Sequence, residues 1–321
     1  MPIIPPFNLS PVARHPRRVP ITSILPMKRV NIVFNPNAGR GRAAALAASA
    51  AQSIVAGGME ARTFTIVEFL REGGAINLGC DCVVSLGGDG TVRAIVEGLA
   101  ARLADPAPPI AVLAMGTANL IAQHLAVPWS ERAGITAMAT AIAAGTTRSM
   151  DVPVANGKPF LLMCSVGFDA QVVHEVAARR RGPISMLHYL PAFARSVVDF
   201  RAEKISVSAD GKHLFGPGPA MVVVASAPEY GTGFSLNPAA TSNDGVLDVT
   251  IFDVSERKHL LATAFHAVTS QVGDGAAIVT TARTVDITGD AAPAQIDGEA
   301  FGHVPLHIGL LPYRQNFIVP A

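Results

Sequence analysis

Three apolar runs in the first half of the chain each end in a glycine-containing turn that leads into a helical stretch. The turns are NPNAGRGRA (35–43), GGDGT (87–91) and MGTANL (115–120). A strand, a tight turn and a helix, repeated along a chain, predict a mostly parallel sheet with helices on both faces. Because the carboxyl ends of parallel strands meet at one edge, the three turns are expected to converge on one crevice.

The pattern changes near residue 148 to short strands separated by turn residues. Asn156-Gly157 lies between two strand-like runs and predicts a hairpin, and Asp210-Gly211 is a second turn signal. We therefore predict a doubly wound, nucleotide-binding α/β domain over 28–148, with 308–321 as a candidate to complete it. A β-rich, antiparallel sandwich-like domain is predicted over 149–307, interrupted by helical stretches around 184–200 and 256–271.

Composition excludes several other classes of protein. The 321 residues carry a formal net charge of +1, which gives no global attraction for nucleic acid. Three cysteines without a CxxC pair disfavour a disulfide framework or a zinc knuckle, and fit a reducing compartment. The uncharged stretch 110–129 is broken by Gly116 and Pro128, so no membrane span is predicted. Seven prolines among the first 26 residues predict a disordered tail over 1–27.

The turn GGDGT places one aspartate among three glycines at a strand–helix junction. Backbone N–H groups of such a turn, together with the following helix N-terminus after Thr91, can bind phosphate oxygens. The carboxylate of Asp89 would repel phosphate, but it can hold Mg²⁺, which bridges phosphate oxygens. The alternative is a tight turn with an incidental aspartate. The chain has no GxxxxGK[ST] motif, so it is not a P-loop enzyme.

A classical dinucleotide site is disfavoured at the first turn. Gly39-x-Gly41-x-x-Ala44 resembles part of the dinucleotide fingerprint. That fingerprint expects an acidic residue at the end of the second strand, whereas Glu60 precedes that strand.

Taken together, the motifs resemble a known family. NPNAG, GGDGT and MGTAN, followed by SNDGVLDVTIF and a DGE segment at 297–299, are similar to the catalytic region of diacylglycerol, sphingosine and ceramide kinases. The resemblance covers about residues 28–315. It implies ATP- and Mg²⁺-dependent transfer of the γ-phosphoryl group to a lipid hydroxyl, with diacylglycerol, ceramide or a sphingoid base as acceptor.

The resemblance also implies roles for individual residues. Asp297 would be the base that accepts the hydroxyl proton, Asp89 would hold the catalytic Mg²⁺ through water, Glu299 would lie near the nucleotide or its metal, and Asp151 would join the acidic network beside Asp89. A structural Mg²⁺ would be held by Thr241, Asp244 and Val246. The implied nucleotide-binding residues are Asn35, Asn37, Gly39, Thr65, Gly87, Gly88, Gly90, Thr91, Gly116, Thr117 and Asn119.

Two departures from the family pattern keep alternatives open. The family often has Asn-Glu where this chain has Arg93-Ala94, and often has Asp where Leu120 stands. A non-catalytic nucleotide- or lipid-binding regulator is therefore one alternative. NAD kinase, which shares GGDGT, is another, although its N-x-G-x-L-G-F pattern is absent where MGTAN stands.

A lipid substrate requires access to a membrane. Arg179, Arg180 and Arg181 precede an apolar, aromatic stretch that continues to residue 201. Basic residues beside an amphipathic helix favour contact with anionic headgroups. We expect a cytoplasmic protein at the inner membrane face; the alternative is a helix packed on the β-rich domain. A homodimer is left open.

Overall fold

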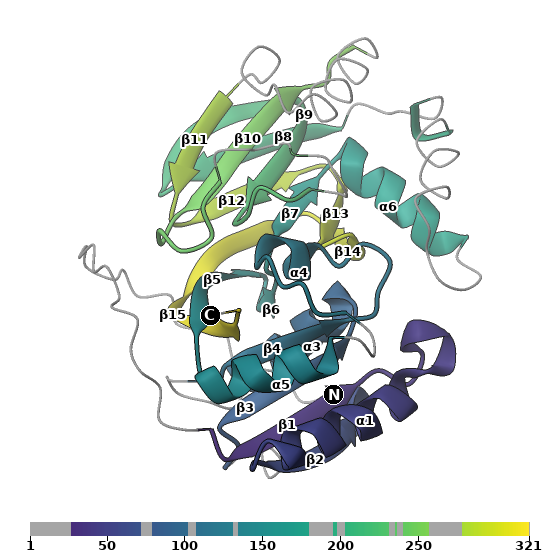
Figure 1. The fold of residues 1–321 in the computed structure, drawn as a ribbon. Helices are drawn as coiled ribbons and strands as arrows, with labels where there is room; N and C mark the ends of the chain where they lie inside the picture. Colours follow the sequence, from purple (N-terminus) through teal and green to yellow (C-terminus); the bar gives the residue numbers. More distant parts are fainter. Residues whose placement is uncertain are drawn as a thin grey trace. The chain divides into compact units, whose positions relative to one another are not determined.

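The computed structural model describes residues 27–71, 79–101, 107–130, 134–179, 195–197, 203–230, 235, 240–256 and 278–320 (Figure 1). Contacts divide these residues into two units. Unit 1 contains the described residues up to Met150 and those from Tyr313 onward, and unit 2 contains Asp151–Pro312. The boundaries predicted from the sequence were after residues 148 and 307.

The centre of unit 1 is a parallel sheet with the strand order β2-β1-β3-β4-β15. Residues 29–34, 82–87 and 110–114 are apolar runs, and the last two are buried along their whole length, as expected for strands covered on both faces. The C-terminal end of β15 pairs through Phe317 with Ile110, so the end of the chain completes this sheet. The strands are β1 (Arg29–Phe34), β2 (Glu60–Thr65), β3 (Cys82–Gly87), β4 (Ile110–Ala114) and β15 (Leu306–Ile318).

Helices cover both faces of the parallel sheet. The first face carries Ile32, Val84 and Leu113, which share one core with helices α1 (Ala43–Ala56) and α5 (Ile135–Ala144) (Figure 1). Side chains alternate along a strand, so the fully buried Val33 and Val83 face the other side. Helices α2 (Ile66–Arg71) and α3 (Asp89–Ala100) contact each other and this sheet. Two short elements remain in this unit, η1 (Ala38–Gly41) and α4 (Leu120–His124).

Unit 2 is built from antiparallel strands. The long strand β9 pairs with β8 through its first half and with β7 and β10 through its second half. It therefore belongs to two strand series, β14-β13-β7-β9-β10-β11 and β9-β8-β12-β15, which enclose one apolar core. The strands are β7 (Met163–Val166), β8 (Lys204–Ala209), β9 (Lys212–Ala225), β10 (Leu247–Asp253), β11 (Ile278–Ala282), β12 (Val285–Gly289), β13 (Pro293–Ile296) and β14 (Glu299–His303).

Two tight turns were predicted correctly from their residue types. Asn156-Gly157 connects β5 (Thr147–Ala155) to β6 (Lys158–Pro159), with φ of 45° and 82°. Asp210-Gly211 connects β8 to β9, with φ of 48° and 75°. Positive φ at both central residues is what a two-residue hairpin turn of this hand requires, and Asn, Asp and Gly tolerate it best.

The structure describes helix α6 in unit 2 and only a few residues of the two helical stretches that the sequence predicted there. Helix α6 (Phe168–Ala178) packs its apolar face against β7, β9 and β10. Of the helical stretches predicted around 184–200 and 256–271, all but residues 195–197 and 256 lie outside the described residues. No helix in the described part of the chain is long and apolar enough to cross a membrane.

The sheet core of unit 1 should tolerate truncation poorly. Val33→Ala removes two methyl groups from a side chain with no exposed surface, and should lower the free energy of unfolding by about 2–3 kcal/mol. Val55→Ala makes the same change on α1 at a side chain that is 57% exposed, and should change it by less than about 0.5 kcal/mol. Denaturant titrations measure both; equal losses would contradict the assigned core.

Candidate active site

The first and third glycine turns meet the second at the carboxyl ends of the strands in unit 1. A Cβ added to Gly116 would lie 2.7 Å from the Cα of Gly88, so the second and third turns touch backbone to backbone. The N–H of Met115 donates to the carbonyl of Gly87 at 2.8 Å, and that of Asn35 donates to the carbonyl of Leu86 at 3.1 Å. The structure therefore brings the three turns together, as the strand pattern predicted.

Glycine is favoured at the first turn by the backbone conformation. Gly39 has a φ of +59°, in the left-handed region that other residues rarely adopt. A Cβ at this position would lie 2.2 Å from Cε of Met115 in the third turn, but this atom is the end of a flexible side chain that can move aside. The first turn therefore lies next to the side chain of Met115.

Several side chains predicted to contact a nucleotide instead form hydrogen bonds within their own turns. Asn35 Oδ1 accepts the N–H of Asn37 at 3.0 Å. Asn119, with a φ of 52°, accepts the N–H of Gly116 at 2.7 Å and donates Nδ2 to the same residue's carbonyl at 2.9 Å. These amides shape the turns in this structure.

Thr65 is also engaged locally. Its N–H and hydroxyl both donate to the carboxylate of Glu68, at 2.7 and 2.8 Å, and these two bonds, the N–H first, lower the pKa of Glu68. The pair is a capping box at the start of α2. The T-x-x-E spacing in the sequence is the usual signal for such a box.

The second turn ends in helix α3, which begins at Asp89. The sequence had placed the helix N-terminus after Thr91, and this was wrong by two residues, because Gly88 is the N-cap. Thr91 lies in the first helical turn, and a Cβ at Gly87 would lie 2.2 Å from its hydroxyl oxygen. The glycine–threonine pair therefore allows the strand to pass close under the helix, whose first N–H groups lack intrahelical acceptors.

Asp89 connects the second turn to the third. Its carboxylate accepts the N–H groups of Leu120 at 3.0 Å and Ile121 at 2.9 Å, at the start of α4. Desolvation by burial raises the pKa of Asp89, and the N–H groups of Ile121 and Leu120 oppose that shift. Leu120 was noted above for lacking a carboxylate; it contacts Asp89 through its backbone instead.

Asp151 lies in unit 2 and contacts the segment 241–246. This buried residue of β5 accepts the N–H of Gly245 at 2.7 Å, and its own N–H donates to the carbonyl of Ser242 at 2.6 Å. The resemblance had linked Asp151 to Asp89, in unit 1. What the structure shows is a link between Asp151 and the loop that carries the predicted structural metal ligands.

That loop presents oxygen atoms suited to a hard cation. Asp244 Oδ1 accepts the N–H of Val246 at 3.2 Å. Nearby, Asp248 is buried and its Oδ2 has no hydrogen-bond partner among the described residues. Burial, and then the charge of Asp244, raise the pKa of Asp248. A divalent cation would satisfy both carboxylates, whereas no group of three His, Cys, Asp or Glu side chains suited to a metal occurs in the part of the chain described.

Asp297 is the first central residue of the tight turn between β13 and β14. Its φ is 48°, and its carboxylate accepts the N–H groups of Leu161 and Leu162 at 2.9 Å and of Met163 at 3.2 Å. Its own N–H donates to the carbonyl of Met163 at 3.0 Å. Glu299, two residues on, is exposed at the start of β14. The DGE segment is thus a tight turn fastened to the start of β7.

A polar network that no sequence motif indicated supports this turn. Buried Gln295 accepts the N–H of Gly298 at 2.8 Å and donates Nε2 to Ser165 Oγ at 2.9 Å and to Asp169 at 3.1 Å. The hydroxyls of Ser165 and Tyr230 also donate to Asp169. Gln295 therefore fixes the turn after Asp297 to the first turn of α6.

Both units resemble domains of known proteins. Residues 29–155 match the family model of the diacylglycerol kinase catalytic domain, and residues 163–319 match the YegS C-terminal NAD kinase beta sandwich-like domain. Diacylglycerol kinase of Bacillus subtilis is 26% identical over 87% of this chain and 92% of its own length. The probable lipid kinase YegS of Salmonella typhimurium is 28% identical over 74% and 78%.

A solved structure shows the same fold. A diacylglycerol kinase from Bacillus anthracis superimposes with a TM-score of 0.67 and 18% identity, covering 91% of this chain and 97% of its own. Two domain models in this order, matched over nearly all of the chain beyond the first 28 residues, define a two-domain kinase. The chain belongs to the family of bacterial lipid kinases related to diacylglycerol kinase and YegS.

The contact between the second and third turns should be sensitive to one methyl group. Gly116→Ala places a Cβ 2.7 Å from backbone, so the turns must separate, and the free energy of unfolding should fall by about 1–3 kcal/mol. Gly57→Ala is the matched control, since its φ is −79° and the nearest atom lies at 3.3 Å. Thermal and denaturant unfolding compare the two; a tolerated Gly116→Ala would show that the turns are not in contact.

The network of Gln295, Ser165 and Asp169 beside the DGE turn should contribute measurably to the free energy of unfolding. Gln295→Ala leaves the N–H of Gly298 and the buried groups of Ser165 and Asp169 short of a partner, which should cost about 1–3 kcal/mol. Gln52→Ala, on the exposed face of α1, is the control and should change stability by less than about 0.5 kcal/mol. If the two variants unfold alike, the network has no structural role.

Proposed function

We propose that this kinase transfers the γ-phosphoryl group of ATP, with Mg²⁺, to a hydroxyl group of diacylglycerol or of a ceramide or sphingoid base. The observation that carries the proposal is the convergence of three glycine turns on one edge of the parallel sheet. The names of the relatives support a lipid as the acceptor.

The turn 87–91 offers the chemistry that the phosphates of ATP need. Glycine backbone and the first turn of α3 present N–H groups, and the missing side chains let phosphate oxygens approach the chain. Desolvation by burial raises the pKa of Asp89 and so disfavours its ionised form, which a hydrated Mg²⁺ beside it would stabilise. When bound, Mg²⁺ neutralises charge that develops on the phosphoryl oxygens.

Asp297 is our candidate for the general base. Three backbone N–H groups hold its carboxylate in place, and a positioned carboxylate can act as a general base. The lipid hydroxyl oxygen would bond to the γ-phosphorus as the bond to the β–γ bridging oxygen breaks. The hydroxyl proton passes to the Asp297 carboxylate, and ADP leaves. Glu299, exposed beside it, would face the nucleotide or its metal.

A second Mg²⁺ is proposed at the loop 241–246, with a structural role. The carboxylate of Asp244 and the backbone carbonyls of Thr241 and Val246 would be its protein ligands. The unpartnered Oδ2 of Asp248 supports this proposal, because a nearby cation would offset the repulsion between the two carboxylates.

A membrane contact is proposed at the basic segment that begins at the end of α6. Arg179 is exposed at the end of α6 and pairs with Glu175 at 2.6 Å, one helical turn away. Arg180 and Arg181 lie outside the described residues. A basic segment at this position would bring unit 2 to anionic headgroups at the inner membrane face.

The decisive experiment measures transfer of labelled γ-phosphate from ATP to a panel of dispersed lipids and to NAD. Asp297→Asn should lower transfer to the lipid about 10²–10⁴-fold, the usual contribution of a general base. Asp210→Asn is a matched control: Asp210 also has a φ of 48°, and its carboxylate also caps backbone N–H groups, those of Arg283 and Thr284. It should keep nearly full activity.

Each result is informative. Equal losses in both variants would mean that Asp297 acts only by holding its turn. Label in NADP rather than in lipid would identify an NAD kinase. Binding of ATP without transfer to any acceptor would identify a non-catalytic regulator and direct attention to Leu120 and Arg93-Ala94.

A further inference from the structure

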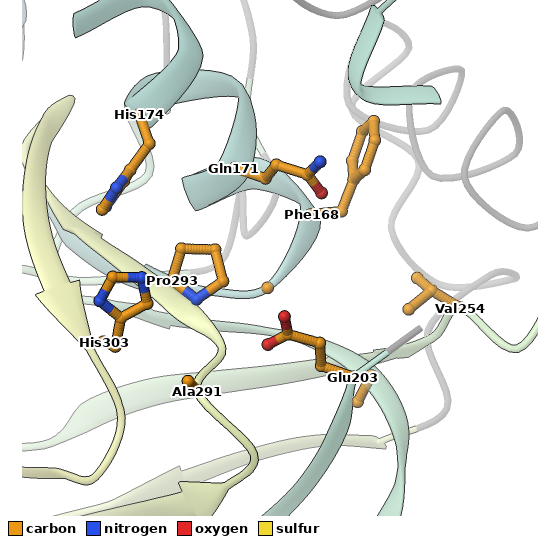
Figure 2. A pocket seen from close by; sticks show the side chains of 10 residues that line it. Phe168, Gln171, His174, Glu203, Val254, Ala291, Pro293 and His303 are labelled. Atoms are coloured by element: carbon orange, nitrogen blue, oxygen red, sulfur yellow. The ribbon is translucent and has the colours of Figure 1, made fainter. Parts of the chain in front are cut away.

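A cavity of about 350 Å³ lies within unit 2, between α6, the residue before β8, and strands β13 and β14 (Figure 2). None of the residues assigned to phosphoryl transfer lines it. In Figure 2 the rings of His174 and His303 lie together at one end, Phe168 and Val254 lie at the other, and the carboxylate of Glu203 lies between them. The cavity is therefore polar at one end and apolar at the other, and its volume falls in the range of small-molecule sites.

The polar side chains of the cavity have unused hydrogen-bonding capacity. Nε2 of His174 lies 2.8 Å from the carbonyl of Ala294; a carbonyl only accepts, so this nitrogen carries a proton, and Nδ1 is the ring nitrogen left for another partner. The ring of His303 meets that of His174 edge to face, with centroids 5.6 Å apart. Neither the His303 ring nor the Gln171 amide forms a side-chain hydrogen bond with any described residue.

Glu203 has the strongest unmet requirement. Its Oε2 is inaccessible to solvent and has no hydrogen-bond partner among the described residues. Burial raises the pKa of Glu203, the charge of His303 opposes that shift, and the charge of Asp290 adds to it. One oxygen of this partly buried carboxylate therefore lacks a hydrogen-bond donor among the described residues, an arrangement that has a free-energy cost.

The chemistry of the cavity defines the ligand class. Glu203 and His174 are polar residues of the cavity lining, and a carboxylate accepts hydrogen bonds, so the cavity favours a ligand that donates them. Glu203 and Asp290 disfavour an anion. The apolar end, formed by Phe168 and Val254, favours a ligand with a hydrocarbon part (Figure 2). A primary ammonium group has three donors and a positive charge, and so meets these requirements together.

We propose that this cavity is a second binding site, for a primary amine with a short apolar body, whose ammonium group binds Glu203. The amine is either a free molecule or the headgroup of an aminolipid. The proposal does not depend on the kinase reaction, because the site is defined by its own side chains and is tested by binding alone.

The test titrates the full-length protein with hexylamine and with 1-hexanol, which has the same chain and no charge. Affinity comes from calorimetry, and the ring signals of His174 and His303 in NMR spectra locate the binding. Hexylamine should bind at least tenfold more tightly than hexanol and shift both rings. Glu203→Gln should weaken hexylamine roughly tenfold to hundredfold, the size of one charge-assisted hydrogen bond.

Controls separate this result from general electrostatics and from misfolding. Glu60→Gln removes the same charge from an exposed position at the start of β2 and should leave hexylamine affinity unchanged. Glu203→Gln should unfold at the same temperature as the parent or higher, because it keeps the size of the side chain and removes a partly buried charge. Vesicles containing phosphatidylethanolamine, compared with phosphatidylcholine alone, distinguish the two sources, since a quaternary ammonium cannot donate hydrogen bonds.

The outcomes are distinguishable. A preference for hexylamine that disappears in Glu203→Gln supports the site. Binding to phosphatidylethanolamine vesicles that also depends on Glu203 would assign the site to a lipid headgroup. Absence of binding to these vesicles would assign the site to a free amine. Equal binding of hexanol, binding unaffected by Glu203→Gln, no binding of hexylamine, or shifts that spare both histidine rings would each overturn the proposal. Loss of kinase activity has no bearing on any of these readouts.

Discussion

The edge of the parallel sheet depends on the contact between the backbones of Gly88 and Gly116. Two turns from adjacent strands can approach this closely only where neither carries a side chain, and the 2.7 Å that a Cβ on Gly116 would have to Gly88 leaves no room for one. The approach brings the N-terminus of α4 to Asp89, and Met115 to Gly39. The three glycine turns therefore meet at one place on the sheet edge. The position of each turn depends on its contacts with the others, and not on its own motif alone.

The carboxylates proposed to act in catalysis are also parts of the scaffold. Asp89 caps the start of α4, and Asp297 accepts three N–H groups from the chain leading into β7. Such bonds hold each carboxylate in one orientation, which suits proton or metal chemistry. They also mean that removing either carboxylate alters structure as well as charge, so comparison with a purely structural aspartate such as Asp210 is needed to interpret the result.

Local features of the fold could be predicted from the sequence, because neighbouring residues determine them. The parallel strands, the glycine turns and the hairpin at Asn156-Gly157 depend on residues close in the chain. The network of Ser165, Asp169 and Gln295 joins residues about 130 apart, and it exists only once β13 pairs with β7. No local pattern marks such a contact. The link between Asp151 and Gly245 was missed for the same reason, and the family resemblance suggested a different partner.

Helix α6 shows how one element can serve two sites with different requirements. Asp169, in its first turn, is fully engaged by Gln295, Ser165 and Tyr230, and this holds the DGE turn. Gln171 and His174, on the cavity side, have bonding capacity left over. Scaffold residues are expected to be satisfied within the protein, whereas ligand-binding residues become satisfied on binding. By that criterion, Asp169 is a scaffold residue and Gln171 and His174 are ligand-binding residues, although all three lie on the same helix. What separates them is whether their hydrogen-bonding groups are satisfied within the protein, more than how deeply they are buried.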